Sequence, residues 1–67
     1  MILQNGSKKN VRVHVEPWGD EYPLAPGEKL RVTGDGPAGG ELEVSWLEDR
    51  VVVHGWSGST VKVEQLG

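Results

Sequence analysis

Apolar and polar residues alternate along most of this chain, which is the pattern of β-strands that bury one face. Between Glu28 and Leu66 the alternation forms four short runs, separated by turns that contain glycine or acidic residues. A period of two residues places successive side chains on opposite faces of a sheet, so each run has one apolar and one polar face. No stretch shows the 3.6-residue period of an amphipathic helix. The pattern therefore predicts an all-β fold in which the last four strands form an antiparallel meander.

The first half of the chain contains further segments with strand character. Ile2–Gln4 is a short segment, and Val11–Glu16 alternates valine with polar residues. Tyr22–Leu24 is expected at a sheet edge, because Pro23 has no N–H to donate to a ladder. We therefore predict one domain over residues 1–67, built as a small antiparallel sandwich or a partly open barrel of five to seven strands.

The turns between the strands predict how the strands pair. Ala25–Glu28 has the proline and the glycine of a type II turn, and Glu48–Asp49 has the length of a tight hairpin turn. A loop over residues 34–40 and a three-residue loop over residues 57–59 complete the meander. Across the three connections of the meander we expect Arg31 opposite Glu43, Val44 opposite Val53, Trp46 opposite Val51, and Val53 opposite Val63.

This register gives the meander one apolar and one polar face. The polar face would carry a row formed by Arg31, Glu43, His54 and Lys62, with Trp56 toward one end. The apolar face must be covered, and we expect the valines of residues 11–16, with Ile2 or Leu3, to cover it. The predicted core positions of the meander are Leu30, Val32, Leu42, Val44, Trp46, Val51, Val53, Val61 and Val63.

The length and composition limit how the fold can be stabilised. A chain of 67 residues has a thin core, and below about 70 to 80 residues a core rarely supplies more than roughly 3 to 5 kcal/mol. There is no cysteine, which excludes disulfides and thiolate metal sites and fits a reducing compartment. Self-association, as a homodimer, is therefore expected. The start of the chain lacks the pattern of a signal peptide, so we expect a cytoplasmic protein.

The charge balance argues against two classes of partner. The chain has ten acidic and seven basic residues, and its formal net charge is −3. A nucleic-acid binder needs a basic stripe that neutralises phosphates, and none is evident. No apolar run approaches the length of a membrane span. We expect neither nucleic acid nor a membrane as partner.

Two patterns could indicate catalysis, and neither has the required context. Residues 34–39 match the spacing G-x-G-x-x-G, but the segment after them is a strand pattern and not the helix that a dinucleotide site needs. Ser57 and Ser59 lie in a turn without the strained elbow of a nucleophile. We therefore expect no enzyme activity and no cofactor.

The two histidines allow a different hypothesis. His14 and His54, together with a carboxylate, could form a 2-His-1-carboxylate metal site if the fold brought them into one pocket. Nothing in the spacing requires this proximity, so solvent-facing histidines and no metal are the prediction. A small metal-binding β-barrel stays an alternative.

The aromatic residues outside the core pattern are the candidate binding residues. Trp56 falls on the polar face by parity, and Trp18 lies in a Pro-Trp-Gly corner near Tyr22. An exposed tryptophan offers a large apolar surface and one N–H donor. We predict a non-enzymatic binding or protein-interaction module that uses Trp18, Tyr22 and Trp56, with Arg31 and His54 for polar selectivity. A carbohydrate- or peptide-binding domain is the alternative, as is a structural role in which these rings plug the ends of the sandwich.

Short motifs in this chain resemble small uncharacterised all-β bacterial proteins. The resemblance is carried by Glu16-Pro17-Trp18-Gly19, Tyr22, Leu24, Pro26-Gly27-Glu28 and Gly55-Trp56-Ser57-Gly58-Ser59. It covers roughly residues 10 to 63. It implies an all-β fold and a bacterial or phage setting, and it carries over no activity and no functional residue.

Overall fold

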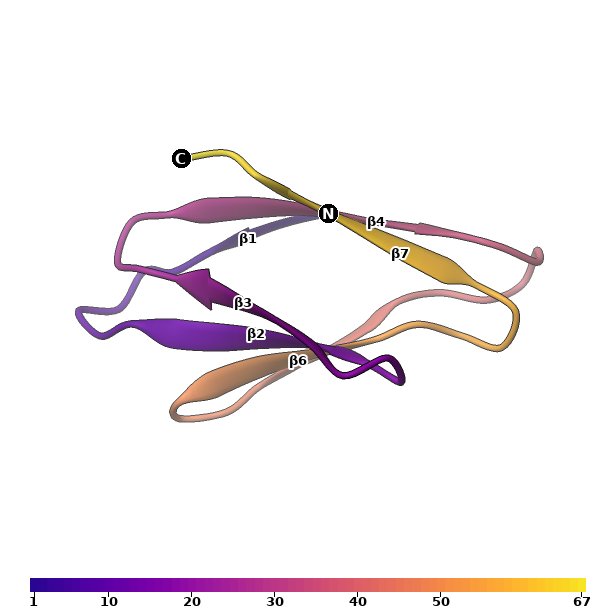
Figure 1. Cartoon of the computed structure of the whole chain (residues 1–67), viewed down its shortest axis with the longest axis horizontal. Coiled ribbons are helices and arrows are strands. Elements are labelled where there is room, and N and C mark those ends of the chain that lie inside the picture. The colour runs from indigo at the N-terminus through magenta and orange to yellow at the C-terminus, as the bar shows by residue number, and fades with distance from the viewer.

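The chain folds into two β-sheets that pack face to face around an apolar core (Figure 1). The computed structural model describes residues 1–67 and has no helix and no closed barrel. It therefore has no helix of the length and apolar character that a membrane crossing requires. The strands are β1 (Ile2–Gln4), β2 (Val11–Glu16), β3 (Asp20–Leu24), β4 (Lys29–Asp35), β5 (Glu43–Trp46), β6 (Arg50–His54) and β7 (Thr60–Gln65). The predicted all-β fold with up to seven strands is confirmed.

One sheet has three strands and the other has four. The three-stranded sheet has the order β1-β4-β7, and the four-stranded sheet has the order β3-β2-β6-β5. All neighbours are antiparallel except β2 and β6, which pair in parallel with Val13 opposite Val51. The prediction of an antiparallel fold therefore needs this correction. Parallel neighbours require a long connection, and here residues 17–49 lie between the two strands.

The predicted four-strand meander is wrong outside its central hairpin. The β5–β6 hairpin has the expected register, with Val44 opposite Val53 and Trp46 opposite Val51. In contrast, β4 pairs with β1 and β7, so Arg31 lies opposite Glu64 and not Glu43. The loops on either side of the hairpin cross from one sheet to the other. Alternation specifies which face of a strand is buried but not which strand is its neighbour, and crossing lets both sheets bury an apolar face.

The core contains the predicted apolar positions except Trp46. Trp46 is 54% exposed, because it lies at the end of an edge strand. Of the two alternatives Ile2 and Leu3, the buried residue is Leu3. Four predicted core residues, Leu42, Val44, Val61 and Val63, are partly buried against the central cluster. The fully or largely buried apolar residues are Leu3, Val11, Val13, Val15, Leu24, Leu30, Val32, Val51 and Val53.

The connection between β3 and β4 has the predicted geometry. Pro23 lies in β3, which is an edge strand as expected. Gly27 has a φ of 81°, and the N–H of Glu28 donates to the carbonyl oxygen of Ala25 at 3.0 Å. These are the features of a type II turn. The carboxylate of Glu28 also accepts a hydrogen bond from the N–H of Ala25 at 2.6 Å.

Near this turn, a buried amide joins three segments of backbone. Asn5 is 2% exposed, and its Nδ2 donates to the carbonyl oxygens of Lys9 (2.7 Å) and Leu24 (2.9 Å). Its Oδ1 accepts from the N–H of Ser7 at 2.9 Å. Every hydrogen-bonding group of the side chain is therefore used, which is the condition for burying an amide at low cost. We call the end of the sandwich formed by the loops 5–10, 25–28 and 47–49 the asparagine end.

Candidate binding site at the tryptophan end

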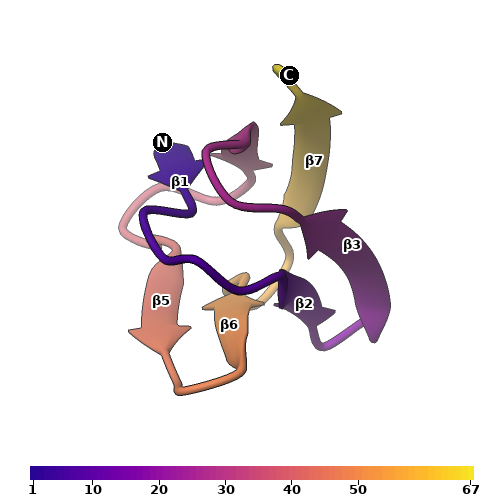
Figure 2. The same cartoon turned by 90° about the vertical axis from the view of Figure 1, so that its left-hand side faces the viewer.

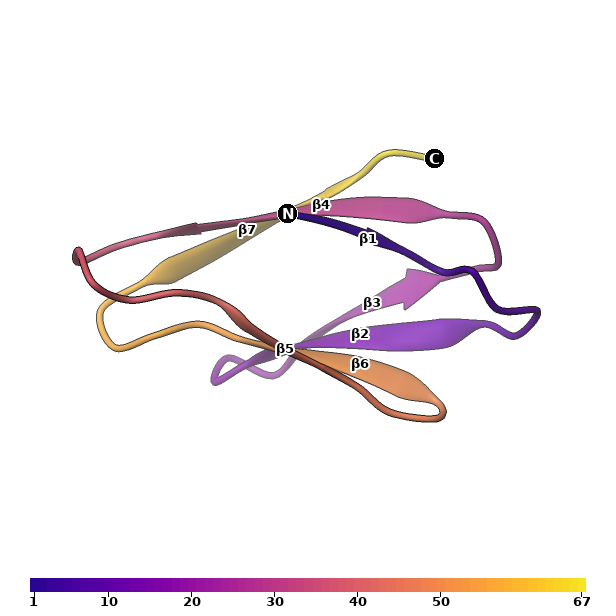
Figure 3. The ribbon, with the colours of Figure 1, turned by 180° about the vertical axis from the view of Figure 1, so that it is seen from behind.

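The other end of the sandwich is formed by three loops that contain two of the three tryptophans. In the four-stranded sheet His54 lies opposite both Glu16 and Glu43, and in the three-stranded sheet Asp35 lies opposite Thr60. The loops 17–19, 36–42 and 55–59 therefore leave the sheets at one end, on the right in Figure 1 and on the left in Figure 3. We call this the tryptophan end.

Glycine is concentrated at the tryptophan end. Of ten glycines, seven lie in its loops or directly beside them: Gly19, Gly34, Gly36, Gly39, Gly40, Gly55 and Gly58. Three of these have a positive φ, which other residues rarely adopt. Two others, Gly34 and Gly40, have no such φ, and their role is to leave room for an indole ring.

The Trp56 ring lies against the backbone of Gly34 and Gly40. A Cβ on Gly40 would collide with the five-membered ring of Trp56, and a Cβ on Gly34 would come within 2.7 Å of Cζ3. The indole Nε1 donates to the carbonyl oxygen of Pro37 at 2.9 Å. The ring is therefore half-buried and hydrogen-bonded, and it fixes the 36–42 loop. Trp56 is in a loop, so the strand parity that placed it on a polar face does not apply.

The backbone around Trp56 is also fixed. Its N–H donates to Oγ of Ser59 at 2.9 Å, and the N–H of Ser59 donates to the carbonyl oxygen of Trp56 at 2.9 Å. Ser59 is buried, and a Cβ on Gly36 would lie 2.7 Å from the Cα of Ser59. The 55–59 and 36–42 loops are therefore in close contact.

Trp18 is the exposed tryptophan of this end. It lies in the turn between β2 and β3, where Gly19 has a φ of 78° and donates its N–H to the carbonyl oxygen of Val15. A Cβ on Gly55 would lie 2.9 Å from Cη2 of the Trp18 ring, so the ring contacts the 55–59 loop. Even so, 47% of Trp18 is exposed. Trp18 thus presents an apolar surface from a turn that is fixed on its inner side.

Tyr22 and Arg31 do not share a surface with the tryptophans, whereas His54 borders the tryptophan end. Tyr22 lies opposite Val13 in β3 and packs against the core. His54 follows the buried Val53 and points outward from the four-stranded sheet at the tryptophan end. Arg31 lies between two buried residues of β4 and points outward from the three-stranded sheet. The expected common face of Arg31 and His54 is therefore wrong, because the two residues lie on opposite outer faces of the sandwich.

The charges at the tryptophan end have one sign. The three loops and the strand residues that border them contain neither lysine nor arginine. A surface of this kind attracts cationic groups and repels anions. The carboxylates there are Glu16, Asp20, Asp35, Glu41 and Glu43.

A groove of about 390 Å³ adjoins Trp56. Its apolar lining comes from Met1, Val32, Leu42 and Trp56, and Glu41 adds a carboxylate. A second groove, of about 430 Å³, lies at the asparagine end, where its charged lining residues, Arg12, Glu28 and Asp49, have both signs. Of the two grooves, only the one beside Trp56 has an aromatic wall, and its one charged side chain is the carboxylate of Glu41.

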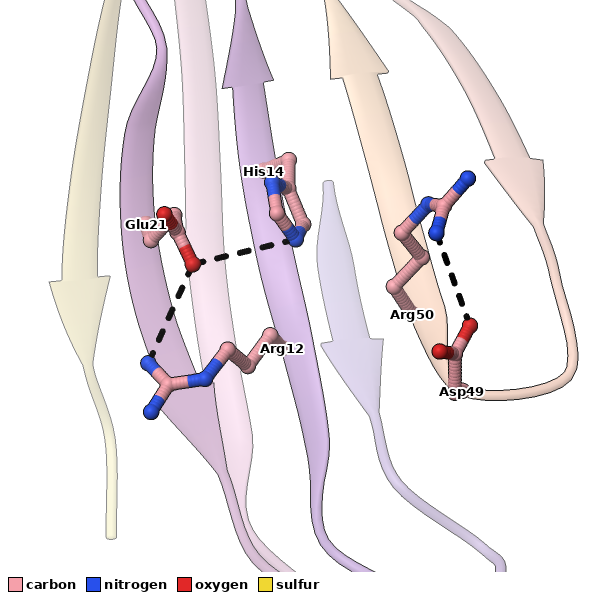
Figure 4. Close-up of polar contacts among 5 residues, drawn as sticks. All are labelled: Arg12, His14, Glu21, Asp49 and Arg50. Atoms are coloured by element: carbon pink, nitrogen blue, oxygen red, sulfur yellow. Dashed lines mark ion pairs between the residues drawn. The ribbon is translucent and has the colours of Figure 1, made fainter.

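The outer face of the four-stranded sheet carries the two histidines. Figure 4 shows His14 together with the nearby ion pairs that involve Glu21 and Arg50. Nε2 of His14 and Nη1 of Arg12 each lie 3.9 Å from Oε1 of Glu21. His14 lies opposite Val52, and His54 lies two pairs further along the same two strands, opposite Glu16. No three histidine or carboxylate side chains come close enough together to hold a metal ion. Long, exposed ion pairs of this kind contribute little to stability.

The segment with G-x-G-x-x-G spacing begins with the last two residues of β4, Gly34 and Asp35, and its remainder is a loop that leads through residues 41–42 into β5. The expected loop over residues 34–40 therefore begins two residues later. No helix follows it, so it lacks the helix N-terminus that holds a pyrophosphate. It differs from the predicted hairpin loop because it connects two sheets. The sequence contains a signal for its role, since a glycine inside a strand, such as Gly34, often marks close approach of another group.

Comparisons with models of protein families, with curated proteins and with solved structures found no match. The resemblance to small all-β bacterial proteins stays a prediction.

Proposed function

We propose that this chain is a non-enzymatic protein-interaction module that binds its partner through the tryptophan end. The observation that supports this most directly is Trp18, which is 47% exposed on a turn that contacts a second loop. A rigid, exposed indole ring loses little conformational entropy on binding and gains from the removal of its apolar surface from water. Tryptophan is accordingly among the residues that contribute most to protein interfaces.

The charges around Trp18 indicate the kind of partner. The carboxylates of the tryptophan end favour lysine or arginine on the bound segment, and these charges increase the rate of association and exclude acidic partners. The groove beside Trp56 offers space for an apolar side chain next to Glu41. The proposed partner is therefore a protein segment with both basic and apolar residues.

The candidate residues have different roles in this proposal. Trp18 makes the main contact, and His54 borders the same end of the sandwich. Trp56 holds the 36–42 loop through its contacts with Gly40 and Pro37 and forms one wall of the groove. Tyr22 supports the fold from the core side, and Arg31 lies outside the proposed surface.

A carbohydrate is the second candidate partner. A flat indole ring flanked by carboxylates, which accept hydrogen bonds, also suits a sugar ring with its hydroxyl groups. Among the described features, the exposed ring of Trp18 beside Asp20 and Glu16 supports this alternative.

Selection from a random peptide library displayed on phage tests the proposal. We expect the selected peptides to be enriched in lysine or arginine next to apolar residues. Trp18→Ala should weaken binding of a selected peptide by about 2 kcal/mol, roughly 30-fold, as expected of an aromatic hot spot. The matched control is Trp46→Ala, which removes an equally exposed tryptophan at the asparagine end and should leave peptide binding unchanged.

Two results would overturn the protein-interaction proposal. One is a selection that yields no specific peptides while a glycan array shows binding that depends on Trp18, which would favour the carbohydrate partner. The other is peptide binding that is equally strong in the native chain and in Trp18→Ala, which would place the surface elsewhere.

A further inference from the structure

Strand β5 is an outer strand of the four-stranded sheet, as Figure 2 shows, and it has unpaired backbone groups along its free side. We propose that β5 pairs with β5 of a second copy of this chain, antiparallel and about a two-fold axis at Ser45. The two four-stranded sheets then form one continuous sheet. This surface is separate from the tryptophan end, so the inference does not depend on the proposed function.

The hydrogen bonds of the hairpin identify the free groups. The N–H of Leu47 donates to the carbonyl oxygen of Arg50 at 2.8 Å, so Leu47 faces β6. Backbone groups alternate between the two sides of a strand, so Ser45 and Glu43 also face β6. Val44 and Trp46 therefore direct their N–H and carbonyl groups to the free side. An edge of this kind is a template for another strand.

The exposure of the side chains of β5 also favours a second copy of this strand as the partner. Trp46 and the adjacent Leu47 are 54% and 46% exposed, although Trp46 is on the same face of β5 as Val44, which packs against the core. A tryptophan on the core-side face at a free edge has no neighbouring strand to cover it. A second copy of β5 supplies that neighbour.

The sequence of β5 fits pairing with itself. With the axis at Ser45, Val44 lies opposite Trp46 of the second copy. The free N–H and carbonyl groups of both residues then form hydrogen bonds between the two copies. Glu43 then lies opposite Leu47 of the second copy, so no like charges face each other. An aromatic and a β-branched residue on directly opposite positions form a favourable cross-strand pair. A shift of the register by two residues would leave either Val44 or Trp46 outside the pairing.

The other sheet edges are less suited to self-pairing. Strand β3 contains Pro23, which cannot donate to a ladder, and β1 has three residues. Strand β7 is longer, but Lys62 lies in its middle on the outer face, and an edge lysine is a common device against pairing. Strand β5 is the edge that combines free backbone groups with an exposed aromatic side chain and no basic residue.

A single cysteine tests this register, because the native chain has none. Residues at position 45 of the two copies form a non-hydrogen-bonded pair with Cα atoms about 4.5 Å apart, which is compatible with a disulfide. Ser45→Cys should therefore form a covalent dimer under mild oxidation on a non-reducing gel. Glu43→Cys is the matched control in the same strand and on the same face. In the proposed register its two copies are roughly 13 Å apart, so it should not cross-link efficiently.

Charge pairing at the same position gives a second test without oxidation. Ser45→Lys and Ser45→Glu should each be monomeric in sedimentation velocity, and an equimolar mixture should form a heterodimer. Circular dichroism establishes that each variant is folded. The inference would be overturned by a native chain that is monomeric at about 100 µM, a concentration well above the dissociation constant of a stable dimer. It would also be overturned by equal cross-linking of Ser45→Cys and Glu43→Cys, or by a dimer that persists in Ser45→Lys.

Discussion

The asparagine end and the tryptophan end of the sandwich are held together by different kinds of contact. At the asparagine end, the Asn5 amide is buried and uses all its hydrogen-bonding groups to join the 5–10 loop to Leu24 in β3. At the tryptophan end, indole rings lie against glycines, with Trp56 on Gly40 and Trp18 on Gly55. The first arrangement satisfies polar groups inside the protein. The second leaves the exposed ring of Trp18 among carboxylates, whereas the exposed Trp46 of the asparagine end lies at the end of the edge strand β5 beside residues of both charges. This difference makes the tryptophan end the better candidate for binding.

The two ends also differ in the signs of their charged residues. The asparagine end contains basic residues, among them Lys8, Lys9 and Arg50, together with acidic residues such as Glu48 and Asp49. The tryptophan end contains carboxylates and neither lysine nor arginine. Mixed charges keep a surface soluble without selecting a partner, whereas charges of a single sign select against like-charged partners.

The largest expected effect concerns the asparagine end. Asn5→Ala should lower the free energy of unfolding by about 3 kcal/mol, because it leaves the buried carbonyl oxygen of Leu24 without a donor and creates a cavity. For a domain of this size, that corresponds to a fall of roughly 12 to 24 °C in Tm, measurable by circular dichroism. Asn10→Ala, in an exposed position of the same loop, is the control and should change Tm little. Equal Tm values for the two variants would show that the buried amide does not hold this end.

Asn5 also illustrates which parts of the fold the sequence could predict. The alternation in Val11–Glu16 and the two-residue turn at Glu48–Asp49 determine local conformation, so that strand and the β5–β6 hairpin were predicted correctly. The neighbours of β4 could not be predicted, because its alternation is compatible with pairing to either β5 or β7. Nothing in the local sequence distinguishes the buried Asn5 from a polar loop residue, because its partners, such as Leu24, are distant in the chain.

The candidate site was predictable to a similar extent. The sequence made Trp18 and Trp56 candidates for exposure, and Trp18, in a Pro-Trp-Gly corner that does not need an aromatic residue for turning, is the one that is 47% exposed. Trp46 was wrongly placed in the core, because strand parity does not show whether a strand lies at an edge. The contact of Trp56 with Gly34 and Gly40 depends on the crossing of the 36–42 loop between sheets, which the sequence pattern did not indicate.

An intermediate effect on stability is expected when a side chain is added at Gly40, against which the Trp56 ring packs. Gly40→Ala should lower the free energy of unfolding by about 2 kcal/mol, because the new methyl group displaces the Trp56 ring and weakens its hydrogen bond to Pro37. Gly6→Ala is the matched control, since Gly6 has neither a positive φ nor any atom near its Cβ position. Thermal unfolding and near-ultraviolet circular dichroism should separate the two variants. A native tryptophan spectrum and an unchanged Tm in Gly40→Ala would contradict the packing of the Trp56 ring on Gly40.

The smallest expected effect on stability is that of Trp18→Ala, which we compare with Trp56→Ala at the same end of the sandwich. Trp18→Ala should cost about 1 kcal/mol or less, because nearly half of the residue is exposed and its ring makes no hydrogen bond. Trp56→Ala should cost more, about 2 to 3 kcal/mol, since it removes the hydrogen bond to Pro37 and the ring contacts with Gly34 and Gly40. Urea unfolding followed by circular dichroism measures both values. Acrylamide should quench the fluorescence of the native chain more strongly than that of Trp18→Ala, because the variant keeps only one of the two most exposed indoles, Trp46. If the costs of the two substitutions were reversed, Trp18 would be the structural residue, and the binding surface would have to be sought in the groove beside Trp56.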